Sequence, residues 1–242
     1  MTTPALTPNP DAADRRTARI AGVFYLLVGI SGGFAEGFVE PKMFALTGTM
    51  TTVENLVANA GLVRLGIVAD LLDQVFFVGL ALILYALLKH VHETAARAMV
   101  ALVLVAAAIA SLAVIFLFEG LQVATDARYL AAFSANGSDA LARILVDAQH
   151  HGLLAAQVFF GLWLAPLGYL ALKSGRFPRS LGYVLILGAV CYLADVLIAF
   201  LAPDVAAAIH GYVVIPCAVA EIGMVLYLLI FGIGSRIAPA RT

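Results

Sequence analysis

The stretch Ala98–Phe118, A-M-V-A-L-V-L-V-A-A-A-I-A-S-L-A-V-I-F-L-F, carries no charge, and its only polar side chain is the hydroxyl of Ser111. An α-helix rises about 1.5 Å per residue, so about 20 residues cross the ~30 Å hydrocarbon layer of a bilayer. The run is that long, and its apolar residues are continuous. A strand of a membrane barrel would alternate apolar and polar residues instead. This stretch therefore predicts a transmembrane helix.

Five more apolar runs surround this one and extend the prediction to the whole chain. They are Ile20–Ala35, Leu65–Leu88, Gly152–Leu172, Leu181–Ala202 and Gly211–Gly234. With their flanks, the six predicted helices cover about residues 18–38, 63–89, 97–122, 140–173, 180–202 and 210–234. The predicted fold class is an all-α polytopic membrane helix bundle. Its single six-helix domain, residues 18–235, lies between a disordered tail (1–17) and a short C-terminal tail (236–242).

The composition agrees with this class. Of the 242 residues, 63% are apolar and 12% are charged, and the mean hydropathy is +1.01. A soluble domain has about 45–50% apolar and about 25% charged residues. A formal net charge of −1 offers no basic excess for nucleic acid, and two cysteines do not make a disulfide framework. We therefore exclude a soluble enzyme, a nucleic-acid-binding protein and a disulfide-rich secreted fold.

The basic residues predict the orientation of the helices. If the N-terminus is cytoplasmic, ten of the fourteen Lys and Arg residues lie in cytoplasmic segments: Arg15, Arg16, Arg19, Lys89, Arg97, Lys173, Arg176, Arg179, Arg236 and Arg241. Cytoplasmic loops of membrane proteins carry such an excess. We expect both termini in the cytoplasm and, because Arg strongly outnumbers Lys in an Ala-rich chain, a bacterial inner membrane.

Local patterns add detail to the loops and helices. Thr51–Glu54 has the residues of a capping box and predicts a short helix to about Asn59. Asn136–Ser138 predicts a turn that leads into the fourth helix. Pro166 and Pro216 are expected to kink the fourth and sixth helices, because proline cannot donate the helical hydrogen bond.

Four acidic residues interrupt the apolar runs: Asp70 and Asp73 in the second helix, Asp195 in the fifth and Glu221 in the sixth. An ionised Asp near the centre of a bilayer costs about 2.5–3.5 kcal/mol, and no Lys or Arg lies within the runs to offset this cost. The carboxyl groups must be protonated, share a proton, hold a cation or meet water. We take these four as candidate catalytic residues, with an interhelical hydrogen-bond network as the structural alternative.

Counting along the helices puts all four acids at the midplane or on its outer side. Other polar residues lie near the same level and are candidate rim or binding residues: Glu36, Arg64, Glu119, Gln122, Gln157 and Tyr192. The pattern predicts an acidic hollow that opens outward. Leu, Val, Ala and Phe would close it on the cytoplasmic side.

The start of the fourth helix contains a candidate metal site. Asp147, His150 and His151 are spaced three and four residues apart with Leu154, so they share one helical face. Carboxylate and imidazole at this spacing suit zinc or a similar ion. Solvated side chains at the membrane interface are the alternative, and no motif in the chain requires a cofactor. Cys191 and Cys217 each precede an intramembrane acid by four residues and lie at about the same depth, so that they could approach each other across the fifth and sixth helices. The favoured interpretation is two small apolar side chains.

Several short motifs, taken together and in order, resemble the bacterial membrane-protein family called domain of unknown function 4386. They are Ala18–Leu27, Gly33–Val39, Arg64–Gly66 with Ala69–Leu71, Leu84-Tyr85, Phe159–Gly161, Leu167–Tyr169, Lys173–Arg179, Tyr192–Asp195 and Glu221. The resemblance extends from about Ala18 to Gly234. It implies a multi-helix membrane fold and supplies no activity, substrate or site residue.

Three classes of function follow from these observations. The main hypothesis is binding or acid–base processing of a lipid-like or isoprenoid small molecule by the four acids. The partner is then a membrane lipid or another amphiphile. A metal held with His150 and His151 would favour hydrolysis. The alternatives are a proton- or cation-coupled small-molecule transporter and a non-catalytic structural or sensory membrane protein.

Overall fold

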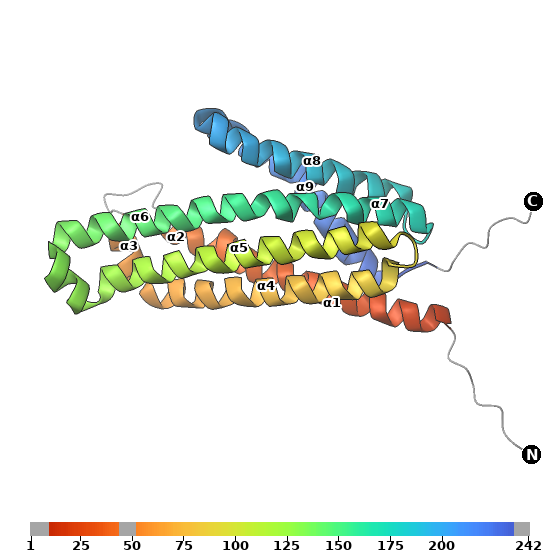
Figure 1. Cartoon of the computed structure of the whole chain (residues 1–242), viewed down its shortest axis with the longest axis horizontal. Helices are drawn as coiled ribbons and strands as arrows, with labels where there is room; N and C mark the ends of the chain where they lie inside the picture. Colours follow the sequence, from red (N-terminus) through yellow and green to blue (C-terminus); the bar gives the residue numbers. More distant parts are fainter. Residues whose placement is uncertain (1–9, 44–51, 235–242) are drawn as a thin grey trace, which may run out of the picture. The chain divides into compact units, whose positions relative to one another are not determined.

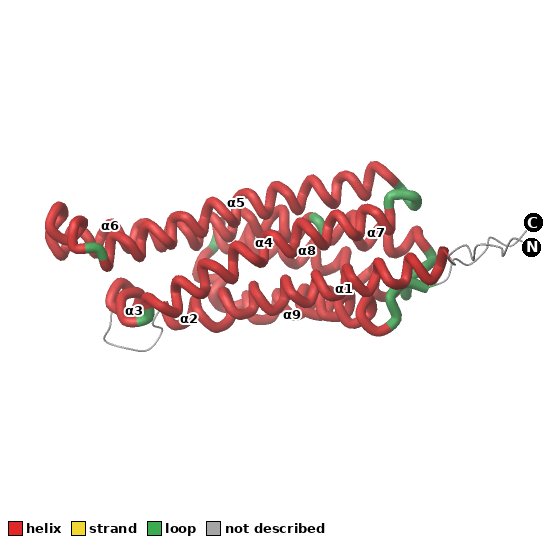
Figure 2. The backbone as a smooth tube through the Cα atoms, turned by 90° about the horizontal axis from the view of Figure 1, so that it is seen from below, coloured by secondary structure: helices red, strands yellow, loops and turns green. Residues whose placement is uncertain are grey.

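The computed structural model describes residues 10–43 and 52–234, in which every regular element is a helix (Figure 1). Figure 2 shows these helices joined by short loops, with no strand in the described residues. The elements are α1 (Pro10–Phe34), the π-helix η1 (Ala35–Val39), α2 (Glu40–Met43), α3 (Thr52–Ala58), α4 (Ala60–Leu88), α5 (Glu93–Thr125), α6 (Ala127–Leu162), α7 (Leu164–Ser174), α8 (Arg179–Leu201) and α9 (Pro203–Ile230).

Six helical stretches of the described chain are long and apolar enough to span a membrane. They are Ala13–Met43, Ala60–Leu88, Glu93–Thr125, Asn136–Ser174, Arg179–Leu201 and Pro203–Ile230. Each overlaps one of the predicted helices, so the all-α class and the six spans are confirmed. The cytoplasmic position of both termini and the choice of membrane stay predictions.

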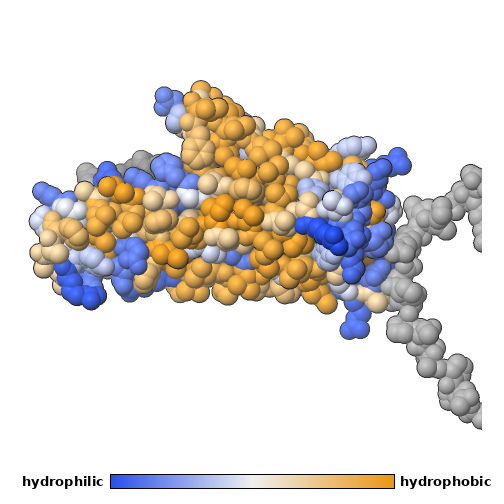
Figure 3. Space-filling model, viewed as in Figure 1, coloured by the Kyte–Doolittle hydropathy of each residue, from blue (hydrophilic) through white to orange (hydrophobic). Residues whose placement is uncertain are grey.

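The outer surfaces of the spans are apolar. Only 22–39% of the most apolar window of each span is buried within the protein. Large side chains such as Val75 (64% exposed) and Tyr212 (76% exposed) point outward. Figure 3 shows hydrophobic side chains along the helices and hydrophilic ones near helix ends and turns. Such exposure suits lipid rather than water, and the protein is a multi-pass membrane protein.

The helices pack as two compact units. The first unit contains residues 1–25, 79–103 and 160–242, and the second contains residues 26–78 and 104–159. Asp195 and Glu221 belong to the first unit, and Asp70 and Asp73 belong to the second. The single domain expected over residues 18–235 stays a prediction.

In the second unit the core lies between α3, α4, α5 and α6. Its buried members include Leu56, Val63, Leu121 and Val146, each with no exposed surface. Small residues let α5 and α6 approach closely, because a Cβ placed on Gly152 would lie 2.8 Å from the Cβ of Ala113. Close packing of small residues is a common way for membrane helices to associate.

In the first unit α8 packs against both α7 and α9, and α8 and α9 run side by side in Figure 1. The contact between α7 and α8 depends on two glycines. A Cβ on Gly168 would lie 2.7 Å from the carbonyl oxygen of Gly182, and one on Gly182 would lie 2.5 Å from Cγ of Leu172. At Gly168 the near atom belongs to the backbone, so a larger residue does not fit there without a shift of the helices, whereas at Gly182 the side chain of Leu172 must also move.

Arg176 joins three parts of the first unit in the loop between α7 and α8. Its side chain is 1% exposed, its Nη1 donates to Asp14 at 2.7 Å, and its Nε donates to the carbonyl of Gly234 at 2.8 Å. The carbonyl of Arg176 accepts from the hydroxyl of Tyr227 at 3.0 Å. A buried guanidinium needs partners of this kind to offset its desolvation.

Two predictions at the helix boundaries were wrong. The N-terminal tail expected over residues 1–17 is helical from Pro10, and Asp14 is held in this helix by Arg176. Residues 1–9 and the expected tail 236–242 lie outside the described residues. The turn before the fourth helix lies at Ser134 (φ 61°, ψ 166°) rather than at Asn136–Ser138. Ser138 is buried, and its hydroxyl donates to the carbonyl of Tyr129 at 3.2 Å, so it forms a hydrogen bond inside the unit instead of a turn at the helix start.

Other local predictions are confirmed in part. The short helix expected from the capping box is present as Thr52–Ala58, while Thr51 lies outside the described residues. The fourth span is interrupted at Trp163, between α6 and α7, three residues before Pro166. This is the region where proline removes a helical hydrogen bond. α9 continues through Pro216, so a kink at this residue stays a prediction.

Candidate functional site

In the second unit, Asp73 of α4 is part of a hydrogen-bonded cluster. Asp73 is 7% exposed. Its Oδ2 accepts from Nε2 of Gln74 at 3.0 Å. Its Oδ1 lies 3.3 Å from the hydroxyl of Ser31 in α1, whose single proton also has the carbonyl of Leu27 as an acceptor at 2.6 Å. Gly32 leaves room for this approach, since a Cβ there would lie 3.4 Å from Oδ1. The amide of Gln74 and the hydroxyl of Ser31 give this buried carboxyl group polar neighbours, which reduce the cost of its burial.

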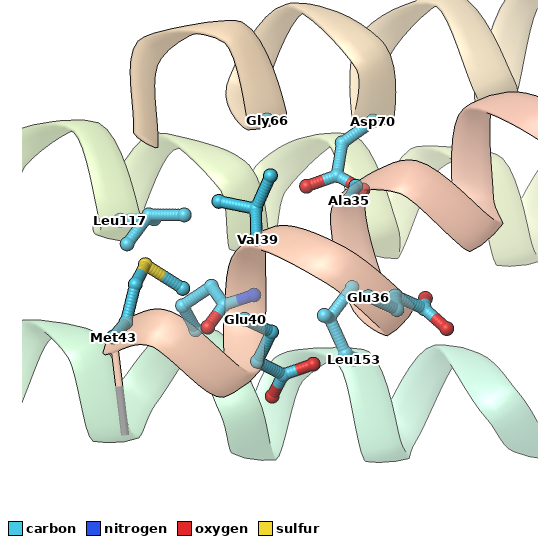
Figure 4. A pocket seen from close by; sticks show the side chains of 10 residues that line it. Ala35, Glu36, Val39, Glu40, Met43, Gly66, Asp70, Leu117 and Leu153 are labelled. Carbon is cyan, nitrogen blue, oxygen red and sulfur yellow. The ribbon is translucent and has the colours of Figure 1, made fainter. Parts of the chain in front are cut away.

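Asp70, one turn earlier in α4, lines a small cavity instead. It is also 7% exposed, and Glu40 and Asp73 lie close enough to act on it electrostatically. The cavity is lined by Ala35, Glu36, Val39, Glu40, Met43, Gly66, Asp70, Leu117, Gln149 and Leu153. Figure 4 shows the Asp70 carboxylate directed from α4 toward the helical turn that carries Ala35 and Val39.

The wall opposite Asp70 is the π-helical turn η1. Ala35 and Val39 are buried in it, whereas the side chain of Glu36 is exposed. A Cβ on Gly66 would lie 3.0 Å from Cγ1 of Val39, so a glycine here lets α4 come close to η1. π-helical turns are rare and are frequent at functional sites.

His150 of α6 contacts the same region. Its Nδ1 lies 3.4 Å from Oε1 of Glu40, and its ring meets that of His151 edge to face, with 5.9 Å between centroids. Asp147, His150 and His151 are exposed side chains. In the part of the chain that the structure describes, no three His, Cys, Asp or Glu residues are grouped so that they could hold a metal ion.

In the first unit, Glu221 of α9 is bonded to two phenols from two other helices. Its Oε1 accepts from the hydroxyl of Tyr192 in α8 at 2.6 Å. Its Oε2 accepts from the hydroxyl of Tyr25 in α1 at 3.2 Å. The carboxyl group therefore links α1, α8 and α9.

Aromatic rings surround these two tyrosines. Trp163 packs on Tyr25 with ring centroids 5.6 Å apart, and Phe160 meets Tyr192 edge to face at the same distance. Tyr25 is 2% exposed and Trp163 is 0% exposed. A Cβ on Gly161 would lie 2.4 Å from the Cβ of Tyr192, so this glycine sets how close Tyr192 comes. The result is an acid held in an aromatic and apolar shell.

Asp195 of α8 pairs with His210 of α9. Nδ1 of His210 lies 3.0 Å from Oδ1 and 3.1 Å from Oδ2 of Asp195. The carboxylate side chain is 5% exposed, whereas the imidazole is 59% exposed. A buried carboxylate is thus connected to the surface of the unit through one imidazole ring.

The two cysteines are free thiols. The thiol of Cys217 is buried and lies 3.5 Å from the carbonyl oxygen of Gly188. Cys191, Asp195 and Glu221 all lie close enough to Cys217 to act on it electrostatically. The interpretation of both cysteines as small packed side chains stays a prediction.

The ordered helices and their intramembrane acids can be compared with known protein families. The family model called domain of unknown function (DUF4386) matches residues 20–232. The chain belongs to this family. No curated protein and no solved structure matches the chain. The resemblance found in the sequence is therefore confirmed, and this DUF4386 protein has a fold and a family without an assigned activity.

The four acids predicted from the sequence of this DUF4386 protein fall into different surroundings. Asp73 and Glu221 are bonded to neighbouring polar side chains, Asp195 is paired with histidine, and Asp70 lines the cavity. The expectation that all four share one outward hollow stays a prediction, since they belong to two units.

The predicted rim residues are also divided. Tyr192 contacts Glu221, and Glu36 lines the cavity. Gln122 and Gln157 are partly buried, while Arg64 and Glu119 are exposed. The assignment of these residues to a binding rim stays a prediction.

Six polar residues of these sites were not among the predicted site residues: Tyr25, Ser31, Glu40, Gln74, Gln149 and His210. Glu40 was missed because the first helix was expected to end near residue 38, whereas the first span continues to Met43. Gln149 is a polar residue inside the fourth span, and this signal was available in the sequence. The contacts of Tyr25, Ser31 and His210 depend on neighbouring helices and had no local signal.

Proposed function

We propose that this DUF4386 protein is a proton-coupled small-molecule transporter. The pair formed by Asp195 and His210 carries this proposal. A carboxylate that is 5% exposed within one apolar span contacts an imidazole that is 59% exposed. Imidazole takes up and releases protons near neutral pH. Ionisable groups inside membrane spans commonly form proton relays.

Glu221 supplies a second proton-binding group in the same unit. It accepts hydrogen bonds from Tyr192 and Tyr25, and Asp195 and Glu221 both lie near Cys217. Hydrogen bonds from two phenols stabilise the ionised form of this carboxyl group, and the apolar shell around it suits the protonated form. The two acids thus support a function in which protons enter at His210 and are held deeper in the spans.

Proton coupling can be tested in proteoliposomes that contain a pH-sensitive dye. A panel of amino acids, sugars, amines and organic acids is added outside, and solute-dependent movement of protons is recorded. We expect at least one solute to move protons, and we expect Asp195→Asn and His210→Gln to lower the initial rate at least about tenfold. Asp204→Asn, an exposed acid in α9, should keep the rate.

Three results would overturn the proposal of proton-coupled transport. It fails if no solute moves protons, or if Asp195→Asn transports at the rate of Asp204→Asn while both proteins show wild-type thermal unfolding. Uptake of a radiolabelled solute without proton movement would also contradict it, because this outcome indicates uncoupled transport.

A second candidate function is favoured by the aromatic shell of Glu221. We propose, as the alternative, acid–base processing of an isoprenoid or similar lipid. Glu221 is bonded to Tyr25 and Tyr192, which pack against Trp163 and Phe160. An acid and aromatic faces are the groups that protonate an alkene and stabilise a cation. The test is mass spectrometry of lipids incubated with purified protein. We expect a product of altered retention with the wild type and none with Glu221→Gln. Unchanged lipids in both samples exclude this function.

A further inference from the structure

The cavity beside Asp70 belongs to the second unit and takes no part in the proposed transport pathway through Asp195 and Glu221. It is small, with a volume of about 10 Å³. This volume holds one water molecule or one ion of similar size, and it excludes a lipid or an organic solute. The occupant is therefore a single small species.

Gln149 contributes a buried amide group to this cavity. It lines the cavity and is 2% exposed, and its Oε1 has no hydrogen-bond partner among the described residues. A buried amide oxygen without a partner costs about 1–3 kcal/mol. Gln149 can therefore present an oxygen ligand to a cavity occupant.

Asp70, unlike its neighbour Asp73, also lacks a hydrogen-bond partner among the described residues. Asp73 accepts from the amide of Gln74 at 3.0 Å and lies 3.3 Å from the hydroxyl of Ser31. For Asp70, the described residues provide no donor, although its carboxylate is 7% exposed. A buried carboxyl group without a donor is stable either in its protonated form or, when ionised, with a positive charge next to it. No Lys or Arg is among the residues that line the cavity.

The charge of the occupant follows from the carboxylates around it. Oε1 of Glu40 lies 3.4 Å from Nδ1 of His150, and the side chain of Glu36 is exposed. Among the carboxyl groups that line the cavity, that of Asp70 is the most deeply buried. One positive charge would balance its ionised form, and carboxylate and amide oxygens are the ligands that hard cations prefer.

We propose that Asp70 and Gln149, with Glu40 at their side, hold one small monovalent cation of the size of sodium. The site lies where the π-helical turn η1 faces α4 and α6 (Figure 4). Discontinuities of the helix at membrane depth are common places for ion sites in membrane proteins. The proposal does not depend on the transport function, because it concerns binding alone.

The experiment measures thermal unfolding of the purified full-length protein in detergent. Sodium, lithium, potassium or choline chloride is titrated at constant ionic strength and constant pH. A cation that binds only the folded state raises the unfolding temperature with its concentration. We expect sodium or lithium to raise it in a saturable manner, and choline, which is too large for the cavity, to leave it unchanged.

Variants assign the effect to this cavity. We expect Asp70→Asn and Gln149→Met to weaken the apparent sodium affinity at least about tenfold, because each removes one oxygen ligand or its charge. Asp139→Asn removes an exposed carboxylate from α6, outside the cavity, and should keep the wild-type affinity. Equilibrium binding of radioactive sodium to the same proteins gives a second measurement that does not depend on their stability.

Several results overturn the proposal. It fails if sodium and lithium act no better than choline on the wild type, which is the outcome if Asp70 is protonated or if water fills the cavity. It also fails if Asp70→Asn and Gln149→Met bind radioactive sodium as the wild type does. Equal losses in Asp139→Asn and Asp70→Asn would indicate nonspecific charge effects and would also exclude the site.

Discussion

Tyr192 in α8 donates a hydrogen bond of 2.6 Å to the carboxyl group of Glu221 in α9. Tyr25 in α1 reaches the other oxygen of the same carboxyl group, so one acid connects three spans. Interhelical hydrogen bonds in membranes contribute about 0.6 kcal/mol on average and up to about 1.7 kcal/mol. The bond is short, and its acceptor lies in an apolar shell, so Tyr192 is expected near the upper end of this range.

The first prediction concerns this bond. Tyr192→Phe removes the hydroxyl and keeps the ring, and we expect it to lower the free energy of unfolding by about 1–2 kcal/mol. The measurement is reversible unfolding in mixed micelles. Tyr183→Phe makes the same chemical change at a side chain that is 64% exposed and should have little effect. Equal effects of the two variants would show that the bond to Glu221 contributes no stability.

The second prediction concerns the glycine contact between α7 and α8. Replacing glycine by alanine within a helix is favourable by about 1 kcal/mol when space is free. At Gly168 the new Cβ would lie 2.7 Å from the carbonyl oxygen of Gly182. We therefore expect Gly168→Ala to lower the unfolding temperature. Gly211→Ala in α9 has no atom within 4 Å and should raise it or leave it unchanged. An increase for Gly168→Ala would contradict the packing of these two helices.

The third prediction concerns the loop between α7 and α8. Arg176→Gln removes the bonds to Asp14 and to the carbonyl of Gly234. Asp14 is partly exposed and finds water instead, so we expect a loss of about 1.5–3 kcal/mol rather than the larger cost of stranding a buried charge. Arg179→Gln, an exposed position in α8, serves as the control. Limited proteolysis should also cut Arg176→Gln faster near its N-terminus, and an unchanged cleavage rate would argue against the tie to Asp14.

The fourth prediction concerns pH and the loop between α5 and α6. Side-chain hydrogen bonds from Nε and Nη2 of the Arg128 guanidinium, together with the backbone N–H of the same residue, lower the pKa of Asp126 below its ordinary value. A lowered pKa in the folded state stabilises the fold above the unfolded pKa of about 4, and this contribution is lost as the pH falls further. We expect Arg128→Gln to raise the pKa of Asp126 toward its ordinary value and to weaken the dependence of stability on acid pH.

The measurement for Asp126 is an NMR titration of its side-chain carboxyl group. Arg143→Gln removes another exposed cation, from α6, and should leave the pKa of Asp126 unchanged. If Arg128→Gln also leaves it unchanged, the guanidinium of Arg128 is not the cause of the lowered pKa.

The membrane class and the spans were predictable from the sequence because hydropathy is a property of each residue and adds up over a local window. The run Ala98–Phe118 predicts a span, and α5 covers it completely. The ends of the spans were less predictable. α1 begins at Pro10, and the first span reaches Met43 through a π-helical turn. Contacts outside the apolar run, such as that of Arg176 with Asp14, leave no mark in a local hydropathy window.

The candidate sites were predictable only as residue types. A carboxyl group in an apolar run is recognisable from its energetic cost, so Asp70, Asp73, Asp195 and Glu221 were identified from the sequence. Their partners were not, because a partner depends on the rotation and crossing of two helices, and neither is encoded in a local window. Tyr25 and Glu221 are 196 positions apart along the chain.

The sequence by itself determined that the protein lies in a membrane, how many spans it has and which acids interrupt them. The tertiary structure decided what surrounds each acid. Asp73 has its donors, Asp195 has an imidazole at the surface, and Asp70 has a cavity with the unpartnered amide oxygen of Gln149. The physical reason is that burial in an apolar medium depends on the residue and the local run, whereas compensation of its cost depends on atoms brought from elsewhere in the chain.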